Sequence, residues 1–301
     1  MCPNPALDVT YGVGELRHGE VHPVVRVHRR AGGKAVNTAR VLHHLRRPTL
    51  LLAPLGGSTG SEVAADLERA GIALHNVPLA GTTRTSVAVT DGSGATVFNE
   101  PGPEVSPHEW RLMVETLRAQ AIADGVSVVV LAGSLPPGAP VDGYAQLIEA
   151  CGARPVVLDA AGAALASALP ASPAVVTPNL AEARDALDTA GGALECAEQL
   201  VLAGARAAVV SDGAHGLTAV CDAARWTARP DAPVSGNPTG AGDAVTAVLA
   251  LGLAEDIPPR ETLRRAVAVA GGAVAAPVAG DIDDAVTARL QTHVLVEEAS
   301  R

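Results

Sequence analysis

Short apolar segments alternate with longer helical ones through much of the chain. Four short segments are rich in β-branched residues, at residues 126–131, 155–158, 174–177 and 207–211. Segments rich in alanine and leucine lie between or beside them, at residues 107–123, 142–151, 180–190 and 194–203. Buried strands that alternate with helices are typical of a parallel sheet covered on both faces. The pattern predicts an α/β fold with a doubly wound, mostly parallel sheet flanked by helices.

Two segments depart from this pattern. Residues 9–29 and 83–99 are polar, strand-like and interrupted by glycines. We expect them to form a small antiparallel β lid on a single domain that spans residues 1–301. Its alternating strands would leave an apolar face and open edges in water, which favours a homodimer formed through the lid. Surface hairpins without a function are the alternative.

The start of the sequence conflicts with this fold. A buried strand is expected before the turn Asn4-Pro5-Ala6-Leu7-Asp8, yet only three residues precede that turn. Three residues are too few for a strand of about five. Two alternatives stay open: the true start lies upstream, or the sheet tolerates a shortened strand.

Composition narrows the class of protein. The formal net charge of −10, without a basic tract, argues against nucleic-acid and anionic-membrane partners. No apolar run approaches the roughly 18 residues that a membrane span needs, and no leader pattern is seen, so we expect a cytoplasmic protein. The four cysteines are far apart in the sequence, which indicates neither a zinc site nor a disulfide framework.

The most specific motif is NPTGAGDA at residues 237–244, followed by a helix of small residues. Glycines before a helix let backbone N–H groups converge on an anion. The carboxylate of Asp243 is placed to take a proton from an attacking hydroxyl, although an aspartate at this position is also a good helix cap. The chain contains neither a Walker loop, GxxxxGK[ST], nor a GxGxxG motif after a first strand.

A second motif, AGGKAVN at residues 31–37, combines a glycine turn, a cation and an amide near a helix start. Lys34 is the only lysine beside 21 arginines, which favours a specific role for its ammonium group. These groups suit a polyhydroxylated, anionic ligand. Upstream, Asn4 and Asp8 are candidates for binding sugar hydroxyls, with an Asx turn as the alternative.

Taken in order, the motifs resemble those of the ribokinase-like PfkB carbohydrate kinases, most closely the 1-phosphofructokinase and tagatose-6-phosphate kinase branch. The ordered motifs are NPALD, AGGKAVN, LGG, TRT, NEPGPEVS, GSLPPG, TPNLAE, SDGAHG and NPTGAGD, and they span nearly the whole chain. Most of them are weak alone, but their shared order is specific.

The resemblance implies ATP-dependent phosphorylation of a phosphorylated hexose, with Asp243 as base and Mg²⁺ as cofactor. It implies that the backbone of Thr239, Gly240, Ala241 and Gly242 binds the transferring phosphate. Sugar hydroxyls would be bound by Asp8, Gly33 and Asn37, and the substrate's own phosphate by Lys34, Arg84 and Ser134. Asn179 and Glu182 would place Mg²⁺ through water. Residues implied near the nucleotide are Asn179, Ser211, Gly213, Gly216, Ala270 and Gly271.

The residues leave three candidate substrates open: fructose 1-phosphate, fructose 6-phosphate and tagatose 6-phosphate. A kinase of a nucleoside or of an unphosphorylated sugar is an alternative. Arg84 and Lys34 argue against it, because two cations are costly to desolvate without an anion. A non-catalytic sugar-phosphate sensor is a further alternative, which the shortened first strand favours and the presence of Asp243 opposes.

Overall fold

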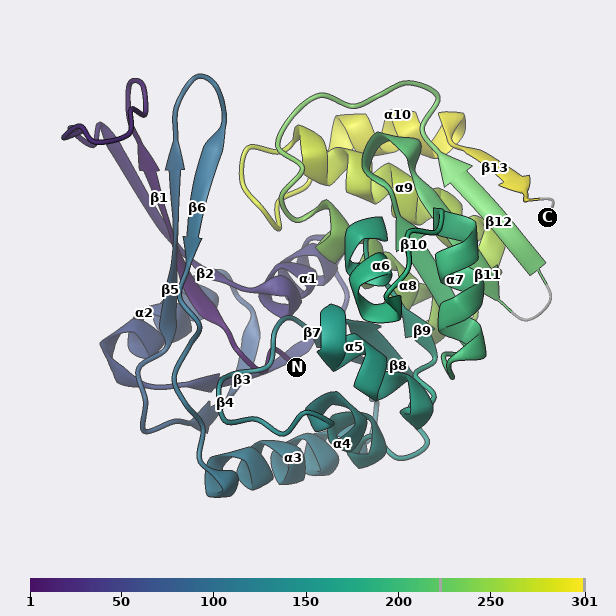
Figure 1. Cartoon of the computed structure of the whole chain (residues 1–301), viewed down its shortest axis with the longest axis horizontal. Helices are drawn as coiled ribbons and strands as arrows, with labels where there is room; N and C mark the ends of the chain where they lie inside the picture. Colours follow the sequence, from purple (N-terminus) through teal and green to yellow (C-terminus); the bar gives the residue numbers. More distant parts are fainter. Residues whose placement is uncertain (222–223, 300–301) are drawn as a thin grey trace.

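The computed structural model, which describes residues 1–221 and 224–299, is built around a seven-stranded sheet (Figure 1). The strand order is β13 (Leu295–Glu298), β12 (Ala224–Arg229), β11 (Leu217–Cys221), β10 (Ala207–Ser211), β9 (Val175–Val176), β8 (Val156–Asp159) and β7 (Val129–Ala132). Strands β7 to β10 are parallel, as expected. Strands β11 to β13, which the sequence pattern did not single out, extend the sheet in antiparallel fashion.

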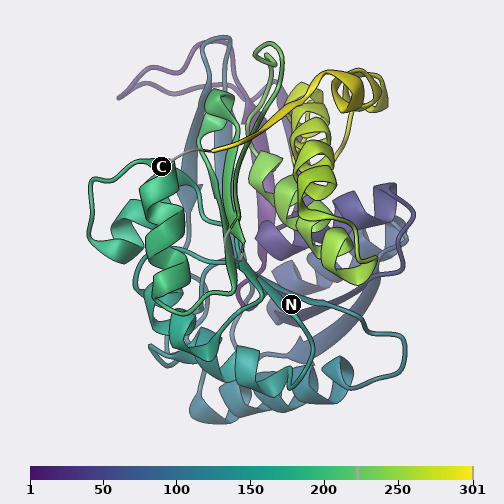
Figure 2. The same cartoon turned by 90° about the vertical axis from the view of Figure 1, so that its right-hand side faces the viewer.

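Helices cover both faces of this sheet, and Figure 2 shows the two layers from the side. The first layer packs Trp110, Met113, Leu147 and Leu200 against the strands. It consists of α3 (Pro107–Ala121), α4 (Gly143–Ala150), α5 (Gly162–Ala168), α6 (Leu180–Leu187) and α7 (Ala193–Leu202). Two 3₁₀ turns, Leu169–Ala171 and Gly213–His215, lie between elements. The second layer consists of α1 (Lys34–His44), α8 (Ala241–Ala254), α9 (Pro259–Ala275) and α10 (Asp284–His293).

Local signals account for several helix starts. Ser106 and Glu109 form a reciprocal capping box at the start of α3, and Pro107 occupies the first turn, where its missing N–H costs nothing. The predicted helical segments match α3, α4, α6 and α7 to within a few residues at their ends. None of the helices in the described part of the chain is both long and apolar enough to cross a bilayer.

The lid is a separate four-stranded sheet in the order β2 (Arg26–Gly32), β1 (Ala6–Gly12), β5 (Arg84–Thr90) and β6 (Ala95–Asn99). It projects beside the main body in Figure 1. The expectation of a purely antiparallel lid is wrong, because its central pair, β1 and β5, is parallel. These strands are far apart in sequence, and a long connection through α1 and α2 (Gly57–Arg69) lets them run in the same direction.

Asp8 lies within β1 of the lid and not in a turn, which corrects the expectation for residues 4–8. The start of the chain takes an unexpected position as well. A third sheet, β3 (Leu50–Leu55) paired with β4 (Ala73–Pro78), stands beyond the β7 edge of the main sheet. Met1 and Cys2 lie between β3 and β7 and hydrogen bond to both.

Candidate active site

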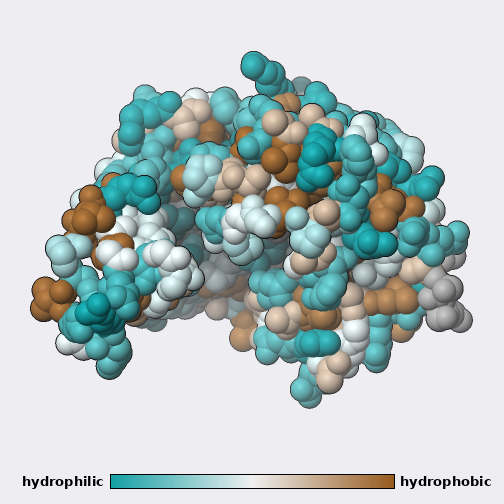
Figure 3. Space-filling view, turned by 90° about the horizontal axis from the view of Figure 1, so that it is seen from above, coloured by the Kyte–Doolittle hydropathy of each residue, from teal (hydrophilic) through white to brown (hydrophobic). Residues whose placement is uncertain are grey.

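One cavity of about 330 Å³ lies where the lid faces the carboxyl ends of β8, β9 and β10. Figure 3 shows the molecule from above, with a hollow between the lid and the body. The cavity is lined by Asp8, Gly33, Lys34, Asn37, Arg84, Ser86, Asn99, Asp159, Thr177, Asn179, Glu182, Ser211, Thr239, Gly240, Gly242 and Asp243. Only Ser86, Asn99, Asp159 and Thr177 are absent from the residues that the sequence predicts for the site.

Asp243 lies in the first turn of α8, and 7% of its surface is exposed. Nδ2 of Asn37, on α1, donates a hydrogen bond to Oδ2 of Asp243 at 2.8 Å. The start of α8 has no side-chain cap, so the alternative of a simple capping role finds no support. Burial, reinforced by the negative charge of Asp159, raises the pKa of Asp243 to about 7. A carboxylate with a pKa near neutrality is well matched to proton transfer.

The backbone before α8 offers N–H groups at a helix N-terminus. Gly240 has a φ of 88°, a left-handed conformation that glycine adopts without strain. The N–H of Ala241 donates to Pro238 O at 3.2 Å, and the N–H of Thr239 to Asn237 Oδ1 at 3.0 Å. Two of the four amides predicted to bind phosphate are therefore used within the turn. Those of Gly240 and Gly242 are the better candidates for an anion.

Lys34 is held between two carboxylates. Its Nζ donates to Asp159 Oδ1 at 2.7 Å and to Glu182 Oε1 at 2.9 Å. Burial alone would lower the pKa of Lys34, but the two carboxylates outweigh it and hold the pKa above its usual range. The ammonium is therefore charged, and it joins the starts of α1 and α6 to the end of β8.

Asp159 is the charged residue among the four lining residues that the sequence analysis did not predict. It is the last residue of β8 and is buried, and burial raises the pKa of its carboxyl group despite the ion pair with Lys34. Thr246 Oγ1, on α8, donates to its Oδ2 at 3.4 Å and also pairs with Thr177 Oγ1 at 3.0 Å. An aspartate directly after the apolar run VVL is the signal that could have found it, because polar groups at the ends of parallel strands gather at one edge.

Of the four residues of the lid strands that line the cavity, Asp8 and Arg84 are charged. The carboxylate of Asp8 lies against the backbone of Gly32. A Cβ on residue 32 would overlap this carboxylate. Burial raises the pKa of Asp8 to about 6, while Arg84 acts in the opposite direction. Arg84 donates to the carbonyl oxygens of Asn4 at 3.2 Å and Glu100 at 3.1 Å. These two bonds fix the guanidinium on the cavity wall.

Asn179 and Glu182 form a capping box at the start of α6. Asn179 Oδ1 accepts from the N–H of Glu182, and Glu182 Oε2 accepts from the N–H of Asn179, both at 2.9 Å. No cluster of three or more His, Cys, Asp or Glu suited to a metal occurs in the described ranges. Oxygen atoms of this pair still fit Mg²⁺ bound through water, since Mg²⁺ prefers oxygen ligands and keeps several waters.

The remaining predicted residues lie outside the cavity lining. Ser134 follows β7 and accepts a hydrogen bond from Asn4 Nδ2 at 3.1 Å. Gly213 and Gly216 flank the 3₁₀ turn between β10 and β11. Ala270 and Gly271 lie within α9, and a Cβ on Gly271 would overlap Leu290 of α10, so this glycine permits close helix packing. The nucleotide-binding roles expected for Gly213, Gly216, Ala270 and Gly271 stay predictions.

The chain is similar to known proteins along nearly its whole length. The sequence profile of the pfkB family carbohydrate kinases matches residues 6–284. Phosphofructokinase-2 from Escherichia coli, solved in complex with potassium, is 25% identical with a TM-score of 0.89, over 97% of this chain and 96% of that one. A possible 1-phosphofructokinase from Thermotoga maritima has the same fold, with 21% identity and a TM-score of 0.89 over 99% of this chain and 98% of that one. The cavity, the helix starts around it and the match of the family profile lead to one conclusion: the chain belongs to the pfkB family of carbohydrate kinases and is a sugar kinase.

Proposed function

We propose that the protein transfers the γ-phosphoryl group of ATP to a hydroxyl group of a phosphorylated hexose, with Asp243 as the base. The observation that carries this proposal is the buried carboxylate of Asp243, with a pKa of about 7, at a glycine-rich helix start. Phosphoryl transfer needs positioning, charge neutralisation and a base within reach of the hydroxyl. The residues of the cavity supply each of these.

The proton transfer is assigned to Asp243. Asn37 holds Oδ2, so we assign Oδ1 as the atom that accepts the hydroxyl proton. The N–H groups of Gly240 and Gly242, at the positive end of α8, stabilise negative charge on the transferring group. Mg²⁺, bound through water to Asn179 and Glu182, would supply further neutralisation of the phosphate charge.

The substrate is assigned to the lid side of the cavity. Asp8, Gly33 and Asn37 bind hydroxyl groups, and Arg84 binds the phosphate that the hexose already carries. Lys34 is the second candidate contact for that phosphate, and Ser134 a third. ATP is assigned to the opposite side, near Ser211 and the turn that contains Gly213 and Gly216.

A screen of ATP consumption tests the substrate class. Fructose 6-phosphate, fructose 1-phosphate and tagatose 6-phosphate are compared with ribose and adenosine as neutral controls. Fructose 6-phosphate is tried first, because a structure of Escherichia coli phosphofructokinase-2 that is 26% identical to this chain contains it. We expect turnover with at least one hexose phosphate and little with the controls. Higher kcat/KM for a neutral sugar or a nucleoside contradicts the proposal and supports the alternative kinase.

Replacement of Arg84 tests the phosphate contact. Arg84→Ala is expected to raise KM for the hexose phosphate about ten- to a hundredfold, the equivalent of a lost charge-assisted hydrogen bond of about 1.5–3 kcal/mol. KM for ATP should change little. The matched control is Arg29→Ala, which removes an arginine of the same lid that is paired with Glu62 outside the cavity. An unchanged KM for the sugar with a raised KM for ATP would place Arg84 on the nucleotide side.

The pH dependence of turnover reports the ionisation of the base. Asp243 must be ionised to accept a proton, and its pKa is about 7. Log kcat/KM should therefore be level above pH 7 and fall below it, approaching about one tenfold step per pH unit. The melting temperature at each pH controls for unfolding. An acid limb that begins only at or below about pH 5, near the value of an ordinary carboxylate, argues against Asp243 as the base.

The lid is proposed to pair with the lid of a second subunit. Val97 and Phe98 on the edge strand β6 are 52% and 60% exposed, and Val27 on the opposite edge is 54% exposed. Figure 3 shows hydrophobic side chains on the projecting lid. A neighbour, phosphofructokinase-2 from Escherichia coli, has been solved in a tetrameric inhibited form, which makes assembly of subunits a known property of that protein.

Light scattering at micromolar concentration is expected to show a dimer. Phe98→Glu should shift it toward monomer, because a charge in an apolar interface is costly to desolvate. Leu202→Glu, at an 85% exposed position on α7 far from the lid, is the matched control and should stay dimeric. A wild-type protein that is monomeric and fully active would refute the lid interface.

A further inference from the structure

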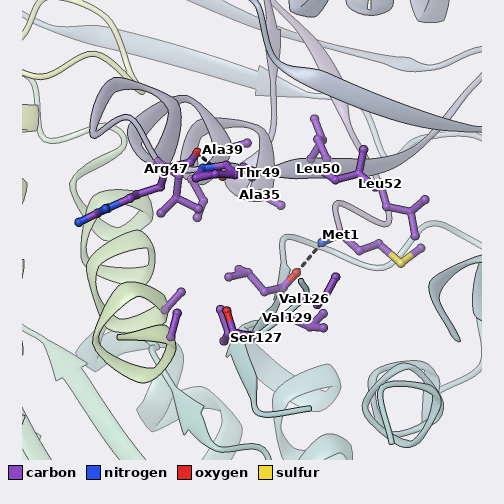
Figure 4. Close-up of a pocket in the computed structure, with 18 of the residues that line it drawn as sticks. Met1, Ala35, Ala39, Arg47, Thr49, Leu50, Leu52, Val126, Ser127 and Val129 are labelled. Carbon is purple, nitrogen blue, oxygen red and sulfur yellow. Dashed lines mark hydrogen bonds between the residues drawn. The ribbon is translucent and has the colours of Figure 1, made fainter. Parts of the chain in front are cut away.

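A gap lies between β3 and β7, and the first residues of the chain occupy only one end of it. Figure 4 shows the amino group of Met1 directed at the strand that carries Val129. This amino group donates to Val130 O, and the N–H of Ala132 donates to Met1 O at 3.2 Å. Such a pair of bonds, to residues on either side of Leu131, is the pattern of a parallel ladder. Met1 is therefore paired as a strand residue beside β7.

The opposite wall of the gap is β3. The N–H of Cys2 donates to Leu52 O at 2.9 Å, so Leu52 directs its backbone groups into the gap. Alternate residues of a strand direct their backbone groups to the same side. Leu50 therefore faces the gap as well, two residues earlier along β3.

The same rule identifies the backbone groups on the β7 side. The N–H of Val129 donates to Pro155 O at 3.0 Å, toward β8. Val128 and Val130 therefore direct their N–H and C=O groups the other way, into the gap. Backbone groups of Leu50 and Leu52 thus face those of Val128 and Val130 across a space that one strand would fill. Buried backbone groups of this kind are nearly always paired in folded proteins.

The space is lined mainly by apolar residues, with polar ones such as Arg47 and Gln120 among them, and helices cover it on both sides. A cavity of about 230 Å³ occupies the gap. Leu117 and Ala121 of α3 line it on one face of the sheet, and Ala39 and Leu42 of α1, with Ala250 of α8, line it on the other. A strand buried on both faces is typically apolar at every position.

The amino group of Met1 is poorly matched to these surroundings. Met1 is 7% exposed, and burial lowers the pKa of its amino group. A buried ammonium is costly unless it is paired with an anion, and its partner here is the neutral carbonyl group of Val130. An amide nitrogen at the same position would donate the same hydrogen bond without a charge.

We propose that the gap takes one further parallel β-strand of about five apolar residues, joined by a peptide bond to the nitrogen of Met1. The residue directly before Met1 would bond to Leu50 C=O and Leu52 N–H. The residue before that would bond to Val128 C=O and Val130 N–H. The occupant belongs to the same chain, since the nitrogen of Met1 already lies in register with β7 and opens into the gap.

The added strand would join β3 and β4 to the main sheet as one continuous sheet. It would also fix the segment that leads into the candidate active site. Cys2 packs against Gly33, with its Sγ 3.0 Å from the position of a Cβ there, and Asn4 binds both Pro101 O and Ser134. These contacts lie between the proposed strand and Asp8.

Three forms of the chain test the proposal. The first begins at Met1, the second carries an N-terminal extension of Met followed by five Val and Ile residues, and the third carries Gly and Ser residues of equal length. We expect the apolar extension to raise Tm by more than about 5 °C, and the Gly-Ser extension to leave it within about 1 °C. Hydrogen exchange at the amides of Leu52 and Val130 should slow at least about tenfold only with the apolar extension.

Equal Tm and equal exchange rates for the two extended forms would overturn the proposal, because the gap would then not accept a strand. Mass spectrometry of the N-terminal peptide of the protein from its natural source identifies the residues that fill the gap. This measurement applies even if the form with the apolar extension is insoluble. A peptide that begins at least three apolar residues before Met1 supports the proposal. A natural N-terminus at Met1 or Cys2 overturns it.

Discussion

The ammonium group of Lys34 is the interaction on which the cavity depends. Asp8, Asp159 and Asp243 bring three carboxyl groups to one place, and Glu182 adds a fourth. Their mutual repulsion and their burial both oppose ionisation, as the raised pKa values of the three aspartates show. Lys34 is the cation that contacts two of the four directly, and it does so from the first turn of α1.

This arrangement divides the acidic groups into two kinds. Asp159 and Glu182 share one cation, which holds both carboxylates in place and offsets one of their two negative charges. Among the described residues, none forms an ion pair with Asp243, whose carboxylate accepts a hydrogen bond from the neutral amide of Asn37. Its pKa is therefore left near 7, where a carboxyl group can gain and lose a proton at neutral pH. Neighbouring carboxyl groups in an enzyme can take different acid–base roles when their surroundings give them different pKa values.

The same cation connects the two layers of the fold. Asp159 ends β8 on one side, and its second oxygen accepts from Thr246 of α8. Glu182 caps α6 and pairs with Lys34 of α1. Two helix starts and a strand end thus meet at one ammonium group, and α8 joins them through the contact of Thr246 with Asp159. This accounts for the position of the single lysine of the chain in a protein that otherwise uses arginine.

The sequence predicted the features that local chemistry encodes. Parallel strands β7 to β10 follow from β-branched apolar runs, and the start of α8 follows from the glycines before Asp243. The sequence did not predict that Asp159 holds Lys34, because this contact joins residues 125 positions apart. The parallel pairing of β1 with β5 is equally non-local. The antiparallel edge β11 to β13 was missed because its strands carry polar residues such as Arg225 and Thr227 among the apolar ones.

The most direct test of the account is Asp243→Asn, measured as kcat and Tm on one preparation. Asparagine keeps the size of the side chain but cannot accept the proton, so we predict a folded protein with kcat lowered about 10²–10⁴-fold and modest changes in KM. Tm should not fall by more than a few degrees, because the raised pKa means that the ionised carboxylate does not stabilise the fold. A folded variant that keeps more than about a tenth of the wild-type kcat would contradict the assignment of Asp243 as the base.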